Sequence, residues 1–215
     1  MGLFNRCRRA VPEPLVEFDT DGRLSVASMA SVRRAAEAGH TGAGGILGAA
    51  LCQAGRYAEG IPWLEGAWAA GDVDAGFNLG TFAKLQGDLN RAEAIWRKVA
   101  DTAASGSADA MLGLARLALE RGDRGEAARW IEPVLGQDDG YPVTALGVAF
   151  RDDGDQSTAL RLFHAAIGRG DPYAMEYAAR IYDARGAAEH AAELRGRAAD
   201  VRTVEANRQS PVLGL

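Results

Sequence analysis

The stretch AGDVDAGFNLG, residues 70–80, carries the pattern that decides the fold. Gly71 suits the left-handed conformation that ends a helix, and the aspartate after it suits the N-cap of the next helix. A carboxylate is also favoured at the positive end of the helix dipole. Leu79 and Gly80 then set a large apolar residue beside a residue without a side chain, which favours a close helix crossing. The stretch predicts a helix, a tight turn and a second helix.

The same signal recurs at a fixed spacing. Glycines stand sixteen residues apart in two runs, with an offset of three residues between Gly87 and Gly122 and one beat missing at Asp138. Sixteen residues hold a helix of about three turns and a short turn. The spacing predicts an all-α chain. The glycines of the two runs are Gly39, Gly55, Gly71, Gly87, Gly122, Gly154, Gly170 and Gly186.

Two kinds of helix alternate, so the full repeat is 32 residues long. The first kind carries a pair such as Leu47-Gly48, and the second a small residue twelve positions later, such as Gly60. Small residues let two helices approach closely, and large apolar residues fill the flanks. The positions of the tryptophans in this pattern place all four in the core: Trp63, Trp68, Trp96 and Trp130.

These features resemble the tetratricopeptide (TPR) repeat, in which small residues stand where two antiparallel helices cross. Residues 70–80 are especially similar to the related Sel-one-like repeat, as are residues 36–43 and 169–174. The resemblance covers about residues 25–202 in five copies, with a period of 32 rather than the 34 typical of the TPR family. It implies a right-handed α–α superhelix, or solenoid, whose concave groove binds proteins or peptides.

This register divides the chain into three segments: a flexible lead over 1–24, a repeat solenoid over 25–202 and a flexible tail over 203–215. One unpaired helix from about Ser25 to Ala38 opens the solenoid as a cap, and five helix pairs follow. The last helix is expected from Ala187 to about Arg202. Its Arg195 lies on a face that no further repeat covers.

Composition excludes several classes of protein. Of 215 residues, 47% are apolar and 25% are charged, as in ordinary folded domains. The net charge of −5 argues against nucleic-acid binding, and no apolar run is long enough for stable membrane insertion. Two cysteines make no disulfide framework, and the N-terminus lacks the apolar stretch of a signal peptide. We therefore predict a cytoplasmic protein, and the excess of arginine over lysine is typical of a GC-rich bacterial genome.

Little in the sequence indicates catalysis, a cofactor or a metal. His40 follows a helix-ending glycine, where it is expected to cap the next helix. His190 and Glu193 share a helix face, but a metal site needs further ligands and none is in register. Asp152-Asp-Gly-Asp155 lacks the distal glutamate of a calcium loop. Cys52 is expected to be a small packed side chain. We predict a protein that is not an enzyme and takes no cofactor.

One face of the first helix of each pair remains for binding, because the core takes the opposite side. It carries one basic residue per repeat over four repeats, with aromatic residues between them. Basic side chains suit acidic groups or a C-terminal carboxylate of a peptide, and aromatic ones suit its apolar side chains. The candidate groove residues are Phe77, Asn78, Thr81, Lys84, Arg116, Tyr141, Arg151, Tyr173 and Arg180.

The alternative for this face is plain solvation, with neighbouring acids paired to the same bases. Such surface pairs contribute about 0–1 kcal/mol each. The acids in question are Asp74, Asp109, Glu120, Asp152, Glu176 and Asp183.

The first helix of the first pair contains Gly42, Gly44, Gly45 and Gly48. Each glycine inside a helix costs about 1 kcal/mol relative to alanine. Close packing against the N-terminal helix is the favoured explanation. A hinge, or a place where a partner's backbone approaches, is the alternative.

The sequence thus predicts a non-catalytic scaffold or adaptor that binds a protein or peptide through a largely preformed groove. The alternative function is that of a structural subunit that self-associates into a larger assembly.

Overall fold

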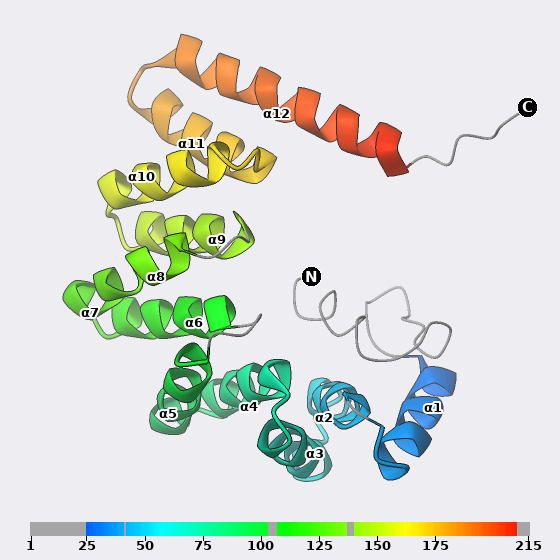
Figure 1. Ribbon diagram of the computed structural model, residues 1–215. Helices are drawn as coiled ribbons and strands as arrows, with labels where there is room; N and C mark the ends of the chain where they lie inside the picture. Colours follow the sequence, from blue (N-terminus) through cyan, green and yellow to red (C-terminus); the bar gives the residue numbers. More distant parts are fainter. Residues whose placement is uncertain (1–24, 41, 103–106, 137–139, 210–215) are drawn as a thin grey trace, which may run out of the picture. The chain divides into compact units, whose positions relative to one another are not determined.

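The computed structural model describes residues 25–40, 42–102, 107–136 and 140–209, and within these ranges it contains helices and no strand (Figure 1). The all-α prediction of one N-terminal helix and five helix pairs is confirmed. The bounds are α1 (Val26–Glu37), α2 (Ala43–Gln53), α3 (Tyr57–Ala69), α4 (Val73–Leu85), α5 (Leu89–Ala100), α6 (Ser107–Glu120), α7 (Arg124–Arg129), α8 (Ile131–Leu135), α9 (Gly140–Asp152), α10 (Gln156–Ile167), α11 (Pro172–Ala184) and α12 (Ala188–Gln209).

The turns between helices follow the predicted glycine rhythm. All eight glycines of that rhythm have a positive φ, between 76° and 94°, where a side chain would be strained. The aspartate that follows then caps the next helix: the Asp72 carboxylate, for example, accepts the backbone N–H of Ala75 at 3.0 Å. The same cap is made by Asp88, Asp123, Asp155 and Asp171. At the start of α1, the Ser25 hydroxyl caps the helix by accepting the N–H of Ser28.

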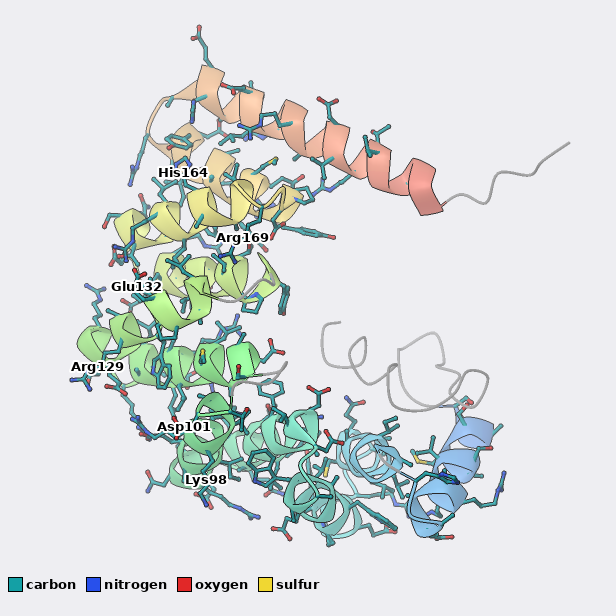
Figure 2. All side chains as sticks on the ribbon, in the orientation of Figure 1. Lys98, Asp101, Arg129, Glu132, His164 and Arg169 are labelled. Atoms are coloured by element: carbon teal, nitrogen blue, oxygen red, sulfur yellow. The ribbon has the colours of Figure 1, made fainter. Side chains whose placement is uncertain are left out.

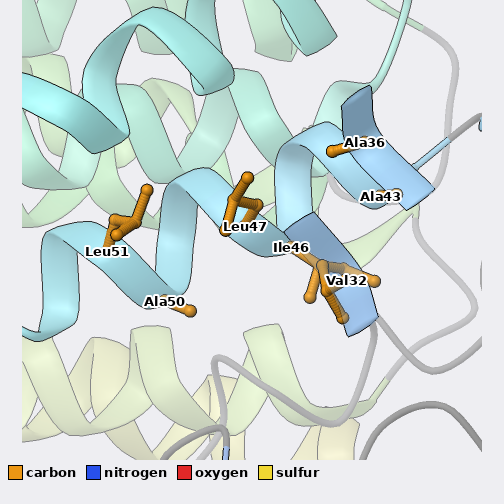
Figure 3. Close-up of a cluster of buried hydrophobic side chains, with 7 residues drawn as sticks. All are labelled: Val32, Ala36, Ala43, Ile46, Leu47, Ala50 and Leu51. Atoms are coloured by element: carbon orange, nitrogen blue, oxygen red, sulfur yellow. The ribbon is translucent and has the colours of Figure 1, made fainter. Parts of the chain in front are cut away.

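The chain divides into two compact units, residues 1–113 and 114–215, and the boundary lies within α6. In the first unit α1 packs on α2, α2 on α3, α3 on α4 and α4 on α5. Figure 3 shows Val32 and Ala36 of α1 against Leu47 and its neighbours on α2. In the second unit α9 packs on α10, α10 on α11 and α11 on α12. Each unit therefore buries its own apolar core.

Small residues do permit the close crossings. At the α2–α3 crossing, a side chain on Gly48 would begin 2.8 Å from the carbonyl oxygen of Gly60, so two backbones meet there. The favoured explanation of the glycine-rich helix is thus correct for Gly48, but its neighbour is α3 and not the N-terminal helix. In the second unit Gly147 lies instead under the ring of Phe163. These positions fix the distance between the paired helices.

The placement of the tryptophans is only partly as predicted. Trp96 is 3% exposed, whereas Trp63, Trp68 and Trp130 are half-buried. The indole is large and is rarely covered completely. Trp68 spreads over Gly76, and the Nε1 of Trp130 is buried without a hydrogen-bond partner among the described residues.

The second helix of the third pair is broken, contrary to the single helix that the repeat predicts. It ends at Arg129 and resumes at Ile131. Pro133 explains the break: it has no N–H for the carbonyl of Arg129, and its ring clashes with that carbonyl. Pro62, in contrast, lies within α3 without ending it.

The last helix continues to Gln209, so the predicted end at about Arg202 is wrong. Two contacts join α12 to α11 at the predicted end, Arg202. Arg202 donates to the Glu176 carboxylate at 2.5 Å, and its guanidinium lies 5.3 Å from the centroid of the Tyr173 ring. Arg195 is exposed as expected and pairs with Asp183. The predicted lead over 1–24 and the end of the tail, 210–215, lie outside the described residues.

Candidate functional site

In the first unit, the predicted groove residues of α4 are partly or fully buried, and Phe77 and Thr81 make contacts within the fold. Phe77 is half-buried and stacks on Trp96, with ring centroids 6.4 Å apart. Its carbonyl oxygen accepts the indole N–H of Trp96 at 3.2 Å and the hydroxyl of Thr81 at 3.0 Å. Lys84 is half-buried near the end of the helix. Asn78 is only 4% exposed. This face of α4 is therefore more enclosed than a solvated surface.

In the second unit, the exposed candidates are aromatic and basic. Tyr141 is 57% exposed and Tyr173 is 62% exposed, which is unusual for side chains of this size. Arg116 and Arg180 are exposed as well, and Arg151 is half-buried. The aromatic rings and guanidinium groups of the second unit that reach solvent thus lie on the first helices of the repeats.

Tyr177 organises two of these arginines, and the sequence analysis missed it. Arg151 lies 4.9 Å and Arg180 5.6 Å from the centroid of its ring. The ring of Phe163 also stacks on Tyr177, with the two ring centroids 5.6 Å apart. Tyr177 follows Asn78 by 99 residues, at the same place in the repeat, so the reasoning that selected Asn78 could have found it.

Part of this basic surface is paired with acids, as the alternative reading of the face expects. Arg151 donates to the carboxylate of the adjacent Asp152 at 2.7 Å. The hydrogen bond from Arg202 lowers the pKa of the Glu176 carboxyl, against the opposing effect of burial. A bound carboxylate would compete with these acids for the guanidinium groups.

A separate hollow of about 500 Å³ lies in the first unit, between α2, α3 and α4. Glycines form much of its wall, including Gly42, Gly44 and Gly45, and Trp63 of α3 stands opposite them. Asp72 and Asn78 contribute polar groups. The volume falls in the range of small-molecule sites, about 300–1,000 Å³.

His40 also lines this hollow, and its predicted role is wrong. The N-cap of α2 is Gly42, with a φ of 81° and no side-chain capping bond. What His40 supplies is its backbone carbonyl, which accepts the N–H of Ala43 at 3.2 Å. Its imidazole is left exposed at the hollow.

The remaining histidines contact Tyr182 in the second unit. The Nε2 atom of His164 lies 2.9 Å from the Tyr182 hydroxyl, and the His190 ring meets the Tyr182 ring edge-on at 4.4 Å (Figure 2 labels His164). In the same view Arg169 marks the end of α10, where its guanidinium donates to the carbonyl of Leu135. The described part of the chain contains no group of three or more histidine, cysteine or acidic residues able to hold a metal ion.

Cys52 is fully buried and is a free thiol. Burial raises its pKa to about 11, so the reactive thiolate is scarce at neutral pH. Its sulfur occupies the α2–α3 crossing, beside Gly60. The expected packing role is consistent with this position.

No family model and no curated protein matches the chain, but solved structures with a similar fold do. A crystal structure of MamA superposes with a TM-score of 0.54 at 17% identity, covering 75% of this chain and 97% of MamA. A second MamA structure gives 0.53 at 16% identity, over 78% and 94%. The APC/C hetero-tetramer Cut9–Hcn1 gives 0.55 at 13% identity, over 84% of this chain and 40% of that one.

These likenesses bear on the fold alone. With the helix pairs and glycine turns, they show that the chain has a TPR-like helical-repeat fold. Within the described residues, no helix combines the length and apolar character that crossing a membrane requires.

Proposed function

We propose that this chain is a non-catalytic scaffold that binds a protein or peptide along the first helices of its repeats. The observation that carries the proposal is the exposed set of rings and guanidinium groups in the second unit. Tyr141 and Tyr173 are 57% and 62% exposed, and the guanidinium groups of Arg151 and Arg180 lie over the Tyr177 ring.

The ligand that suits this surface is an extended peptide with acidic side chains or a free C-terminal carboxylate. Guanidinium groups bind carboxylates through paired, charge-assisted hydrogen bonds. Arginines that rest on a tyrosine ring lose less freedom on binding than mobile ones, which lowers the entropic cost. The exposed tyrosines supply apolar area for the flanking side chains of the peptide.

A capture experiment with a matched control tests the proposal. The variant Arg116→Glu/Arg151→Glu should lose a partner that the native chain captures from its own cytoplasm, with unchanged circular dichroism. The control Arg129→Glu/Arg161→Glu reverses two charges on exposed residues of the second helices and should retain the partner. Equal retention by both variants would contradict the proposal. Comparing free and amidated C-termini of the captured peptide identifies the carboxylate contact.

Self-association is the second candidate function. Large apolar or aromatic side chains are exposed at Leu85, Tyr141, Tyr173 and Val204, and such groups favour contact between copies. Sedimentation at increasing protein concentration distinguishes the two functions. A mass that grows with concentration, and that does not respond to Arg116→Glu/Arg151→Glu, would favour a self-associating subunit. For both candidate functions we propose that the protein is cytoplasmic.

A further inference from the structure

Three glycines of the first unit, Gly42, Gly44 and Gly45, line the hollow at positions that carry side chains in the second unit. A Cβ atom on Gly44 would lie 3.7 Å from the Trp63 ring, an ordinary contact distance, so this glycine is not required by packing. At the corresponding place in the second unit, 99 residues on, Val143 fills the space and is fully buried. Tyr141 and Thr144 likewise replace Gly42 and Gly45. The repeat can therefore be filled at this place, and in the first unit it is left open.

One oxygen of a capping carboxylate faces this space. The Oδ1 atom of Asp72 accepts the N–H of Ala75, while its Oδ2 atom has no hydrogen bond among the described residues. A Cβ on Gly45 would begin 2.5 Å from that Oδ2 atom. In the second unit the equivalent cap, Asp171, has its Oδ2 atom bound at 2.5 Å by the hydroxyl of Thr144. The first unit lacks the donor that completes the cap in the second.

A buried amide in the wall is also without a partner. Asn78 is 96% buried and lines the hollow, and no hydrogen bond of its side chain occurs within the part of the chain that the structure describes. The described residues hold one fully enclosed side-chain group without a partner, the Trp130 indole N–H, so the Asn78 amide is not cut off from solvent and is open to the hollow that it lines. A ligand in the hollow would supply that partner.

The charges of the wall select the ligand. The Asp72 carboxylate lines the hollow, and none of the described residues that line it is a lysine or an arginine. The face of the Trp63 indole adds a surface that attracts cations. We propose that this hollow binds an organic cation, a guanidinium or primary ammonium group, between Trp63, the Oδ2 atom of Asp72 and the Asn78 amide. Of the candidate groove residues this site uses only Asn78, and it uses none of the second-unit residues that carry the proposed function.

Calorimetric titration of the full chain tests the site. The probes are N-acetyl-arginine amide, methylguanidinium and, as a neutral isostere, N-acetyl-citrulline amide. We expect saturable binding of the arginine probe and binding of the citrulline probe weaker by about tenfold or more, since hydrogen bonds between charged groups are the strong ones. Binding of methylguanidinium with equal affinity would mean that a small cation suffices. Binding of the arginine probe alone would point to a residue of a peptide.

Three variants locate the binding. Asp72→Asn keeps an N-cap but removes the charge, and should weaken binding of the arginine probe about tenfold or more. Asp171→Asn makes the same change in the second unit and should leave binding unaltered. Gly45→Thr should abolish binding by placing a side chain in the hollow, with circular dichroism as a check of the fold. If Gly45→Thr does not fold, the comparison of Asp72→Asn with its control Asp171→Asn still tests whether the hollow is the binding site.

The proposal is overturned by any of three results. The first is that no probe saturates at concentrations on the order of 10 mM. The second is that the citrulline probe binds as tightly as the arginine probe. The third is that Asp171→Asn weakens binding as much as Asp72→Asn does.

Discussion

The helices α2 and α4 of the first unit and α9 and α11 of the second have the same register, yet they are built differently. In each unit a helix-ending glycine, Gly71 or Gly170, is followed by an aspartate that caps the next helix. In the second unit the space before the cap holds Val143 and Thr144, and Tyr177 supports two arginines beside it. In the first unit the same positions hold Gly44, Gly45 and Asn78, and a hollow remains.

This difference separates what a repeat needs for its fold from what it adds. Turn and cap are present in both places, so they belong to the architecture. Filling the space next to the cap is optional, because the first unit keeps its register without it. Exchanging features between the two places tests this distinction through Val143→Gly, Thr144→Gly and Gly44→Ala, and Asp155→Ala tests an aspartate cap by itself.

Val143→Gly should have the largest effect. It removes a fully buried side chain and introduces a glycine inside α9. We expect a loss of about 3 kcal/mol in the free energy of unfolding of the second unit, from the cavity and from helix propensity together. Hydrogen exchange resolved by peptide would measure this, since it reports each unit separately. A loss below about 1 kcal/mol would show that the second unit also tolerates a hollow.

Thr144→Gly removes the hydroxyl that completes the Asp171 cap. The carboxylate oxygen would then resemble the one in the first unit, and the unfolding free energy should fall by about 2 kcal/mol. Thr144→Ser retains the hydroxyl and should restore most of this. Equal destabilisation by both variants would mean that the methyl group matters and the hydrogen bond does not.

Asp155→Ala tests a cap by its pH dependence. The backbone N–H of Thr158, with further hydrogen bonds from the hydroxyls of Thr158 and Ser157, lowers the pKa of Asp155 to about 2. Because the folded-state pKa lies below that of an unfolded aspartate, about 4, the carboxylate stabilises the fold above that value and ceases to do so as pH falls towards 2.

At neutral pH the loss of this cap should cost about 1 kcal/mol. The difference in melting temperature between Asp155→Ala and the native chain should therefore shrink between about pH 4 and pH 2. Ser157→Ala, which removes one of the donors, serves as a milder comparison. A difference that stays constant over this interval would contradict the assignment.

Gly44→Ala should have the smallest effect on stability, with the opposite sign. The new methyl group meets only ordinary contacts with Trp63 and Ala67, so the gain in helix propensity should stabilise the first unit by up to about 1 kcal/mol. Gly48→Ala is the contrasting variant, because its methyl group would meet backbone at 2.8 Å and should destabilise. Thermal unfolding of both measures the contrast. Destabilisation by Gly44→Ala would show that packing does require this glycine.

Much of the fold could be read from the sequence because the signals are local. The helix-ending glycines and the aspartate caps act within one turn of the chain, and all of those predicted at Gly-Asp pairs form as expected. The break before Ile131 was missed although Pro133 signals it, because the repeat pattern was allowed to override the proline. The end of α12 was missed because the helix continues from Thr203 to Gln209 with no repeat signal, and its contact with α11 lies before that segment, at Arg202.

The candidate site was less predictable. The sequence placed Phe77 and Arg151 on one face of their helices but could not reveal their partners, Trp96 and Tyr177, which depend on how neighbouring helices stack. The positions of the tryptophans predicted four core residues, while the structure buries Trp96 and leaves the others half-covered. Side-chain exposure depends on neighbours that a periodic pattern does not specify.

The sequence by itself determined the helices, their turns and the 32-residue repeat, because these follow from interactions between residues close in the chain. Only the tertiary structure decided what each glycine of α2 does. Gly48 meets the backbone of α3, whereas Gly45 meets the carboxylate of Asp72 at the edge of the hollow. The two are the same residue in the same helix, and the physical difference lies in which neighbouring element approaches each of them and how closely.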